Sequence, residues 1–319
     1  MKLFLVTGGA GFIGSNIVRK LLSDGYAVRV IDNLSTGNTA NLEDVNGDID
    51  FISGDICDFS TVQASVKDVD YIIHQAALPS VPRSIQDPIS SNLVNVNGTL
   101  NLLVAAKDAK VQKFVMASSS SVYGNTPELP KHEDMAPQPL SPYATSKIAG
   151  ERYAMNFASL YGLPTVALRY FNVFGPYQDP KSFYSAVIPK FIRAILKGEP
   201  VIVHGDGEQS RDFTFVENVI DANIRACLSE ACGEFMNVAC GGRYTLNQLV
   251  QLLQDIIGTK AQVQYQESRN GDVKHSHAAI DKAKIKIGYS PEVSFEDGLK
   301  KTVEWYKFKI NETAKSSNR

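Results

Sequence analysis

The sequence of 319 residues predicts an α/β fold, a doubly wound parallel sheet (Rossmann) joined to a second, smaller α+β lobe. Short, almost continuously apolar runs alternate with amphipathic helical patterns through the first half of the chain. This is the pattern expected where helices cover both faces of a parallel sheet. A glycine-rich segment joins the first apolar run to the first helical pattern. After about residue 171 the alternation ends, and Pro/Gly loops separate the remaining elements.

Six runs are predicted strands, because each is short, apolar and followed by turn residues. They are KLFLV (2–6), YAVRVID (26–32), DFISGD (50–55), VDYIIHQA (69–76), KFVMASS (113–119) and TVALRY (165–170). Two sets of apolar residues at helical spacing predict helix faces between them. The first set is Ile13, Ile17, Val18, Leu21 and Leu22, and the second is Leu93, Val96, Leu100, Leu103 and Val104. Later helical patterns cover 216–229, 245–257 and 294–309.

The composition is that of an ordinary globular protein, with 44% hydrophobic and 21% charged residues. A net charge of −2 provides no long-range attraction for nucleic acid or an anionic membrane. No run is long and apolar enough to span a membrane, and the N-terminus has a strand pattern rather than a signal peptide. We therefore expect a cytoplasmic protein. His275 and His277 have no third ligand spaced to join them, so no metal site is expected.

The segment VTGGAGFIGSN carries Gly8, Gly11 and Gly14 between the first strand and the first helix. Glycines there let the backbone turn tightly and approach a diphosphate, which then lies at the positive N-terminus of the helix. Asp32 ends the next strand, where a carboxylate accepts hydrogen bonds from both ribose hydroxyls and repels a 2′-phosphate. No arginine follows it in IDNLSTGN, so the sequence predicts NAD rather than NADP.

Two further strand ends are compatible with this cofactor, although the residues alone leave alternatives. Asp55 could meet an adenine edge or could cap its own loop. Ala76 and Ala77 suit the close passage of a dinucleotide, and they suit tight packing equally well.

The pattern Tyr-x-x-x-Lys occurs at Tyr143/Lys147 and at Tyr177/Lys181. Residues 141–142, Ser-Pro, are good N-cap and first-turn residues, so the first pair shares one face of a helix. Tyr177 lies between two prolines, where no helix can keep the spacing, and we interpret that copy as coincidence. A phenol titrates near ~10, and acting as a base at neutral pH requires about 4 kcal/mol of preferential stabilisation of the phenolate. A lysine ammonium and the positive nicotinamide of NAD could share that task.

A serine hydroxyl near such a pair could pass the proton or hold the substrate oxygen. Ser118 to Ser121 follow a predicted strand in KFVMASSSSVYG, at the edge of the sheet where α/β proteins bind ligands. The alternative is a polar turn.

These features together resemble the extended short-chain dehydrogenase/reductase superfamily, through the glycine array, Asp32, the serine run before VYG, and PYATSK. Within it, HQAALPSVPRSIQDP, RYFNVFGPYQDP, GDGEQSRDF and RNGDVKHSHA resemble the UDP-hexose 4-epimerases, in particular the branch acting on UDP-N-acetylglucosamine. The resemblance covers nearly the whole chain. It implies an NAD cofactor, a UDP-sugar substrate and a homodimer joined through helices such as 91–109 and 142–160.

The resemblance also implies roles for individual residues. The catalytic residues are Ser119, four residues before Tyr123, with Tyr143 as the base and Lys147 as its partner. The expected cofactor-binding residues are Gly8, Gly11, Phe12, Ile13, Gly14, Asp32, Asn33, Ser35, Thr36, Gly37, Asp55, Ile56, Gln75, Ala76, Ala77, Asn95, Tyr143, Lys147 and Phe171. The expected substrate-binding residues are Ser80, Val81, Ser119, Ser120, Tyr143, Asn172, Ala186, Val187, Val203, His204, Arg211, Arg269, Asp272 and Ser276.

The chain is expected to have two functional units. Residues 1–172 form the NAD-binding Rossmann domain, to which 213–240 return, and residues 173–212 and 241–319 form the UDP-sugar-binding lobe. Arg211 and Arg269 lie in turn-rich segments of that lobe, and a diphosphate needs cations with bidentate reach. Taken singly, each arginine is more typical of a surface salt-bridge partner. Asn172 could hold a sugar diphosphate or could tie down its own loop.

The expected reaction is the interconversion of UDP-GlcNAc and UDP-GalNAc, and also of UDP-Glc and UDP-Gal, through a transient 4-keto sugar. In the family, a tyrosine four residues after the aspartate of the R-x-G-D element excludes an N-acetyl group. Ser276 occupies that position here, so the resemblance implies that an N-acetyl group is admitted. A larger pocket rarely rejects a smaller substrate strongly.

Other functions remain as alternatives. UDP-glucuronate 4-epimerases are similar near SSSSVYG but commonly carry threonine where Asn172 stands. Nucleotide-sugar dehydratases and decarboxylases typically have an acidic residue beside the catalytic serine or threonine, where this chain has Ser120. A catalytically silent NAD-binding scaffold would be expected to lose Ser119, Tyr143 or Lys147, and all three are present.

Overall fold

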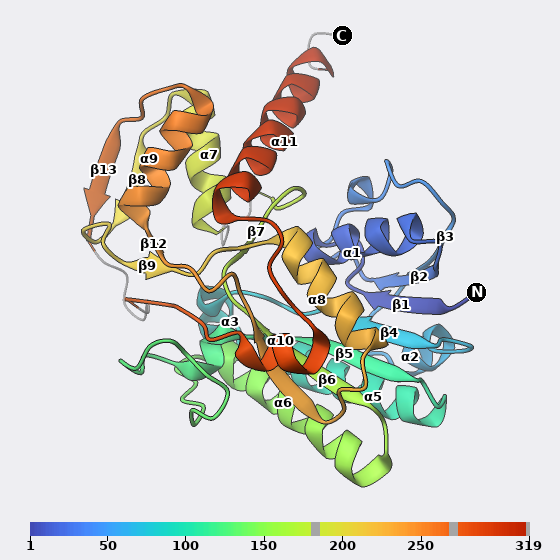
Figure 1. Cartoon of the computed structure of the whole chain (residues 1–319). Helices are drawn as coiled ribbons and strands as arrows, with labels where there is room; N and C mark the ends of the chain where they lie inside the picture. Colours follow the sequence, from blue (N-terminus) through green and yellow to red (C-terminus); the bar gives the residue numbers. More distant parts are fainter. Residues whose placement is uncertain (180–185, 268–273, 317–319) are drawn as a thin grey trace.

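The computed structural model describes residues 1–179, 186–267 and 274–316, and its centre is a parallel β-sheet (Figure 1). Within those residues the sheet has seven strands in the order β3-β2-β1-β4-β5-β6-β11. The strands are β1 (Leu3–Thr7), β2 (Ala27–Asp32), β3 (Ile49–Ser53), β4 (Tyr71–His74), β5 (Lys113–Ser119), β6 (Thr165–Tyr170) and β11 (Glu234–Val238). The predicted α/β class is confirmed, and each of the six predicted runs forms a strand.

The strand order places a ligand-binding edge between β1 and β4. From β1 the chain proceeds outward through β2 to β3, then returns to β4 on the other side of β1 and proceeds outward again. Ligands of such sheets bind outside the carboxyl ends of the strands at this reversal. The last strand, β11, comes from the returning span 213–240 and pairs in parallel with β6, with Met236 opposite Leu168.

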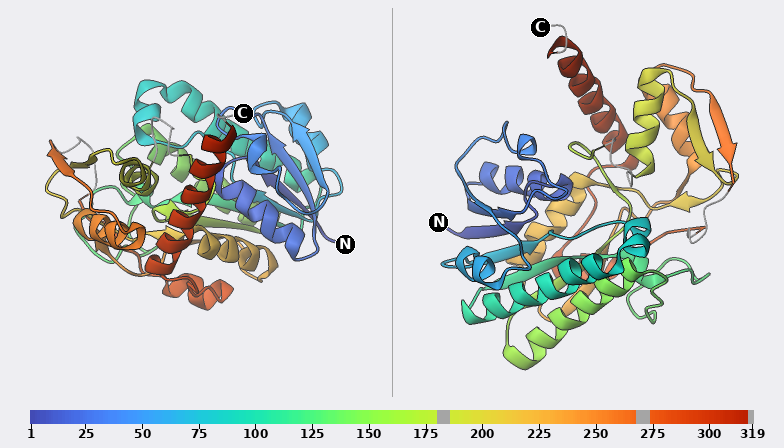
Figure 2. Two further views of the ribbon diagram at one scale, coloured as in Figure 1. Left: turned by 90° about the horizontal axis from the view of Figure 1, so that it is seen from above. Right: turned by 180° about the vertical axis from the view of Figure 1, so that it is seen from behind.

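Helices cover both faces of the sheet (Figures 1 and 2). Helices α1 (Phe12–Ser23) and α8 (Val216–Leu228) pack together on one face. On the other face lie α2 (Phe59–Ser65), α5 (Thr99–Asp108) and α6 (Pro142–Tyr161), with the short helices α3 (Val81–Gln86) and α4 (Pro88–Asn92) beside α6. Strand side chains alternate between these layers, so that Phe4 and Val6 join the core under α1 while Leu5 joins the core under α5.

The segment before α5 differs from the single amphipathic helix expected over residues 93–104. Residues Leu93–Gly98 form a π-helical stretch, η2, in which the wider turn rotates the following residues relative to an α-helix. Leu93 is therefore 48% exposed, and only Leu103 of the expected face is fully buried. Asn95 and Gly98 face inward instead.

The second lobe is assembled from segments that lie far apart in the sequence (Figure 1). Its helices are α7 (Val187–Lys197), α9 (Leu246–Ile257) and α11 (Phe295–Ser316), of which α9 and α11 confirm predicted patterns. Three short strand pairs join segments that are remote in the sequence. They are β8 (Val201–His204) with β13 (Val263–Gln266), β9 (Ser210–Arg211) with β12 (Tyr244–Thr245), and β7 (Val173–Phe174) with β10 (Thr214–Phe215). The proposed domain boundaries stay a prediction, and α10 (Asp281–Ile287), from the span assigned to the second lobe, packs against β11.

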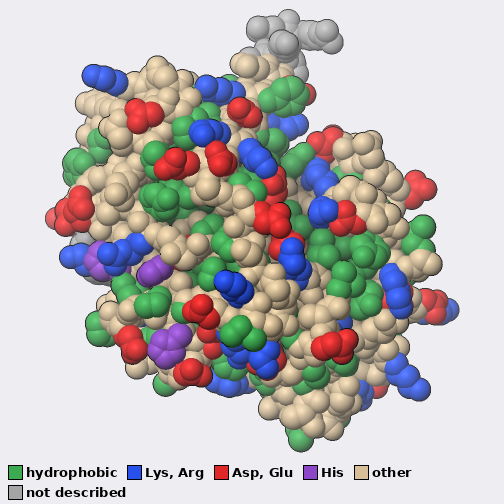
Figure 3. All heavy atoms as spheres, in the orientation of Figure 1, with side chains coloured by type: hydrophobic (Ala, Val, Ile, Leu, Met, Phe, Trp, Pro, Cys, Tyr) green, Lys and Arg blue, Asp and Glu red, His purple; other side chains and the backbone are tan. Residues whose placement is uncertain are grey.

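On the face shown in Figure 3, charges of both signs lie side by side and form no extended region of one sign. None of the helices in the described part of the chain is long and apolar enough to cross a membrane.

Candidate active site

The glycine loop after β1 brings backbone close to the strand ends. Gly8 has a φ of +67°, and a Cβ on it would lie 2.7 Å from the Ala76 amide nitrogen. A Cβ on Gly14 would lie 2.1 Å from the Gly8 carbonyl oxygen, so a side chain at either position would collide with backbone. Gly11 is the N-cap of α1 and, with Phe12 and Ile13, lines a cavity of about 670 Å³. The first turn of α1 therefore faces a space that fits a diphosphate.

Two carboxylates from neighbouring strand ends line the same cavity. The Asp32 carboxylate accepts hydrogen bonds from the Ala10 amide at 3.0 Å and the Leu34 amide at 2.8 Å, which fix its orientation. Asp55 accepts the Cys57 amide at 2.8 Å and the Asn33 side-chain amide at 2.9 Å. The two alternatives for Asp55 are thus compatible, because it caps its own loop and also lines the cavity. The glycine backbone, the helix terminus and Asp32 together fit a dinucleotide.

Ser119, Tyr143 and Lys147 meet at this cavity. Ser119 is the last residue of β5 and the N-cap of the 3₁₀ turn η3 (Ser120–Tyr123). Tyr143 and Lys147 lie on the first turns of α6, which begins as expected with the Ser141 hydroxyl accepting the Ala144 amide at 3.2 Å. The Lys147 ammonium donates to the Ala117 carbonyl at 3.0 Å and lies 6.0 Å from the centre of the Tyr143 ring.

Burial dominates the electrostatics of this pair. Desolvation raises the pKa of the Tyr143 phenol above its usual value, and a hydrogen bond with Ser119 opposes the increase. Desolvation lowers the pKa of the Lys147 ammonium to about 8, so this group is mostly protonated at neutral pH. The chain's own groups therefore keep a positive charge beside a phenol that, on its own, remains protonated at neutral pH.

A buried histidine, which the sequence reasoning missed, links this edge to α5. The Thr99 hydroxyl donates to the Asn95 carbonyl, so it must accept from His74 Nε2 at 2.9 Å. His74 Nδ1 is then the acceptor for the Thr7 hydroxyl at 2.7 Å, which in turn accepts the Ala76 amide. Burial, with Lys147 nearby, lowers the pKa of His74 to about 3 and keeps the ring neutral.

A second missed group is an ion pair inside the protein. Arg169 on β6 and Glu151 on α6 are both fully buried, and two hydrogen bonds of 2.9 and 2.6 Å join them. The Ser118 hydroxyl donates to the same carboxylate at 2.9 Å. Glu151 thus connects α6 to the strand that ends at Ser119. Neither sequence spacing nor residue type distinguishes these two residues from surface charges.

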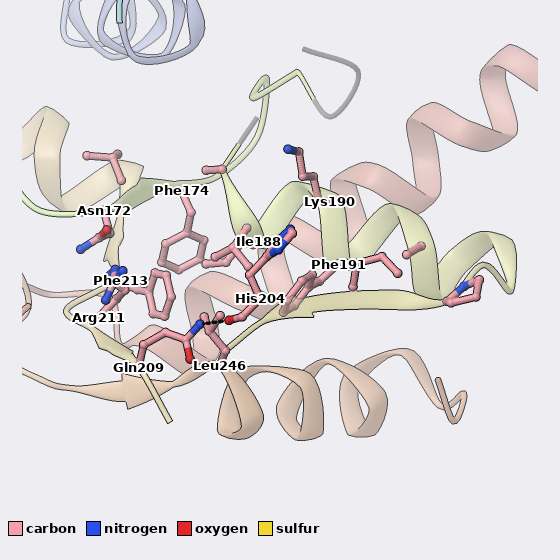
Figure 4. Close-up of a pocket in the computed structure, with 16 residues that line it drawn as sticks. Asn172, Phe174, Ile188, Lys190, Phe191, His204, Gln209, Arg211, Phe213 and Leu246 are labelled. Carbon is pink, nitrogen blue, oxygen red and sulfur yellow. Dashed lines mark hydrogen bonds between the residues drawn. The ribbon is translucent and has the colours of Figure 1, made fainter. Parts of the chain in front are cut away.

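A second cavity, of about 550 Å³, lies in the second lobe between α7 and β8 (Figure 4). Of the expected substrate residues, it is lined by Asn172, Ala186, Val187, His204 and Arg211. Asn172 and Ala186 line both cavities, so the two spaces meet there.

The Asn172 side-chain amide donates to the Asp212 carbonyl at 3.1 Å, which connects two loops at that junction. Figure 4 shows Asn172 and Arg211 near one end of the second cavity. Lys190, Phe191 and Phe213 also line it, and nothing in their spacing predicted this.

Most of the expected cofactor residues line the first cavity, and some expected residues do not line either one. The latter are Gly37, Val81, Asn95, Ser120, Phe171, Val203 and Ser276. Val203 and Phe171 are fully buried, and Asn95 binds the Ser146 hydroxyl and the backbone of Leu78. Arg269 and Asp272 lie outside the described residues. Ser35 and Thr36, expected to bind the cofactor, and Ser80, expected to bind the substrate, all line the first cavity.

The second Tyr-x-x-x-Lys copy is described only at its tyrosine. Tyr177 lies in a turn with a φ of +69°, and Lys181 lies outside the described residues. Tyr177 nevertheless lines the first cavity, together with Trp305 of α11. Among the described residues, no cluster of three or more His, Cys, Asp or Glu side chains could hold a metal ion.

Comparison with known proteins gives a consistent family. A model of the NAD dependent epimerase/dehydratase family matches residues 4–239. A putative UDP-glucose 4-epimerase of Methanocaldococcus jannaschii is 39% identical over 307 residues, covering 96% of this chain and 98% of that protein. A UDP-glucuronate 4-epimerase of Thermodesulfobacterium geofontis is 37% identical over 322 residues, covering 97% and 98%. The solved UDP-N-acetylglucosamine 4-epimerase of Methanobrevibacter ruminantium, in complex with UDP-N-acetylmuramic acid, has a TM-score of 0.93 and 44% identity, covering 97% of this chain and 99% of its own. The chain therefore belongs to the NAD-dependent epimerase/dehydratase family.

Proposed function

We propose that this NAD-dependent UDP-sugar 4-epimerase interconverts UDP-GlcNAc and UDP-GalNAc, and also UDP-Glc and UDP-Gal. One observation carries the proposal. Ser119, Tyr143 and Lys147 meet in a cavity lined by the glycine loop, and Asn172 and Ala186 connect that cavity to a second one lined by Arg211. The 44% identity to a UDP-N-acetylglucosamine 4-epimerase supports the choice of sugar.

Each of the three catalytic side chains has a distinct task. NAD, when bound, supplies the hydride acceptor and a positive charge. The Tyr143 phenolate takes the proton of the sugar's 4-hydroxyl, and Ser119 donates a hydrogen bond to the same oxygen. Lys147, held by the Ala117 carbonyl, stabilises the phenolate. Bound NAD would hold the hydride taken from carbon 4 and would return it to the opposite face once the ketone has turned about its diphosphate linkage. Tyr143 would then return the proton to the same oxygen.

The second lobe is proposed to hold the nucleotide end while the sugar turns. Arg211, on β9 at the second cavity, is suited to a diphosphate because guanidinium binds such oxygens in a bidentate manner. His204 and Asn172 line the same space. The domain roles follow: residues 1–172 with 213–240 bind NAD, and residues 173–212 with 241–319 bind the UDP-sugar.

The acceptance of an N-acetyl group rests on Ser276. Its amide donates to the Ser210 carbonyl at 3.0 Å, which places it beside Arg211 in the β9 region. Ser276 lines neither described cavity, so its proposed role as a size gate rests on the family resemblance, in which a tyrosine at this position fills the space that an N-acetyl group would need.

UDP-glucuronate epimerisation is the second candidate, because a relative of that name is 37% identical over nearly the full length. Dehydration and decarboxylation are less well supported. Ser120 stands beside Ser119 where an acid would be needed, and the Glu151 carboxylate behind Ser118 is occupied by Arg169.

We extend the proposal to a cytoplasmic homodimer. Exposed apolar side chains are concentrated on α3, α4 and the neighbouring α6, where a second copy could cover them. They include Ile85 at 64%, Ile89 at 80% and Leu160 at 72% exposure.

The test is to incubate the purified protein with UDP-GlcNAc, UDP-Glc or UDP-GlcA and to separate the products. We expect the first two to be converted. Ser276→Tyr should lose activity towards UDP-GlcNAc while retaining it towards UDP-Glc. Ser23→Tyr, an exposed serine at the far end of α1, is the matched control and should convert both. Conversion of UDP-GlcA alone would instead establish the second candidate.

A further inference from the structure

The segment Gly175–Asp179, named here the latch segment, follows β7 at the edge of the NAD cavity. Tyr177 at its centre has a φ of +69°, a region that residues other than glycine, asparagine and aspartate rarely adopt. Such a conformation persists only where the surroundings hold it in place. The contacts of the latch segment therefore need a physical explanation.

Tyr177 forms a closed triangle with two residues of the nucleotide-binding half. Its ring lies under the Arg19 guanidinium of α1, 3.8 Å from the carbon at the centre of that group. Its hydroxyl donates to Asp44 Oδ2 at 2.6 Å. Arg19 also binds the other oxygen of the Asp44 carboxylate. Each member contacts the other two, so the ring is fixed both by stacking and by a charge-assisted hydrogen bond.

Further contacts fix the segment from both sides. The Asn16 side chain on α1 donates to the Pro176 carbonyl at 3.1 Å. On the opposite side, the Trp305 ring of α11 lies 5.1 Å from the Tyr177 ring, centre to centre. The neighbouring Tyr306 hydroxyl donates to the Gln178 carbonyl. The latch segment thus joins the helix of the glycine loop to the C-terminal helix.

These residues share one cavity with the glycine loop. Phe12 and Ile13 line it at the start of α1, and Tyr177, Gln178 and Trp305 line it from the latch segment and α11. The cavity that fits the dinucleotide is therefore bounded by a segment that bridges two helices. Moving the latch segment away from the cavity would break these Tyr177 contacts.

We infer that Tyr177, fixed by Arg19 and Asp44, retains NAD in its cavity between turnovers. The inference rests on the proposed function for its purpose, because a 4-epimerase that returns the hydride to the same NAD has no need to release it. The inference itself concerns only the rate at which NAD leaves. Tyr177 is a positioning residue and takes no part in proton transfer.

The test measures NAD release from the holoenzyme after dilution into NAD-free buffer containing an NAD-consuming enzyme. Tyr177→Phe removes the hydrogen bond to Asp44 and keeps the ring, and we expect release to be roughly threefold to tenfold faster. Tyr177→Ala also removes the stacking on Arg19, and a further increase of about fivefold is expected. Asp44→Asn, which keeps an acceptor but loses the charge, should give a smaller increase than Tyr177→Phe.

Tyr265→Phe is the matched control. The Tyr265 hydroxyl donates to Asn247 Oδ1 at 3.0 Å on the surface of the second lobe, outside both cavities. Its loss should leave NAD release unchanged. Equal release rates in wild type and Tyr177→Phe would overturn the inference, as would equal acceleration in the control. The KM for the UDP-sugar should be the same in wild type and Tyr177→Phe, because a general loosening of the fold would raise it. If Tyr177→Ala does not fold, Tyr177→Phe and Asp44→Asn decide.

Discussion

The carboxyl edge of the main sheet and the cavity of the second lobe are built in different ways. At the sheet edge, Gly8 and Asp55 lie just after β1 and β3, and Asp32 and Ser119 end β2 and β5, so the order of the parallel strands brings them together. In the second lobe, Arg211 reaches its cavity through two-residue strand pairs between distant segments. A site at the ends of parallel strands can be predicted from local sequence patterns. A site built by strand pairs between distant segments depends on long-range pairing, which local patterns do not reveal. The two regions should accordingly fail in different ways when mutated.

The largest expected effect is at the sheet edge. Tyr143→Phe removes the proposed base and should lower kcat by about a hundredfold to ten-thousandfold, with NAD still bound. Steady-state kinetics and NAD content after gel filtration measure the two quantities. Tyr153→Phe, at an exposed tyrosine on the same helix, should have wild-type kcat. Full epimerase activity in Tyr143→Phe would refute the assignment.

A smaller effect of a different kind is expected in the second lobe. Arg211→Ala should raise the KM for the UDP-sugar by about tenfold to a hundredfold, because it removes charge-assisted hydrogen bonds to the diphosphate. Arg211→Lys keeps the charge without the fork geometry and should be intermediate. Arg243→Ala, at an exposed arginine that lines neither cavity, serves as the control. The contrast between the two regions would break down if Arg211→Ala lowered NAD content and left KM unchanged.

The smallest effect concerns stability at the strand ends. The imidazole titrates near 6.5 when unfolded, and burial lowers the folded pKa of His74 to about 3. Between these two pH values the unfolded state binds one more proton than the folded state does. The part of the free energy of unfolding that depends on a neutral His74 is therefore complete above pH 6.5 and is lost as the pH falls towards about 3. Between pH 7 and 5.5, the free energy of unfolding measured in urea should fall by about 1.4 kcal/mol more in the wild type than in His74→Asn. Parallel pH profiles in the two proteins would show that His74 is not the titrating group.

The sequence predicted the fold where periodicity is local. The six strands, α1 and the start of α6 at Ser141 were all predictable, since apolar runs and capping residues lie within a few positions of each other. The face predicted over residues 93–104 was right for Leu100, Leu103 and Val104, which pack into the core. It was wrong at its start, because the π-helical stretch changes the register and no residue type indicates such a turn. Leu93 faces solvent for that reason.

The candidate site was predictable to a similar extent. Family resemblance and strand ends identified Ser119, Tyr143 and Lys147, which meet as expected, although their roles remain predictions. Ser276 and Val203 do not line a described cavity, because their place depends on how distant segments pair. The sequence could not reveal that His74 binds two threonines, since both partners are remote along the chain. The spacing around Tyr177 predicts no catalytic role, and its packing role depends on Arg19, Asp44 and Trp305, which are remote along the chain.

The Glu151–Arg169 pair has a consequence for how this protein can diverge. Losing either partner leaves one ionised group without a counter-charge in the interior, at a cost of about 3–5 kcal/mol, whereas replacing both with apolar residues can be neutral. A chain that exchanges the two residues one at a time therefore passes through a strongly destabilised single mutant. Descendants of this chain should therefore keep both residues or exchange both, and this constraint falls on α6, which also carries Tyr143 and Lys147.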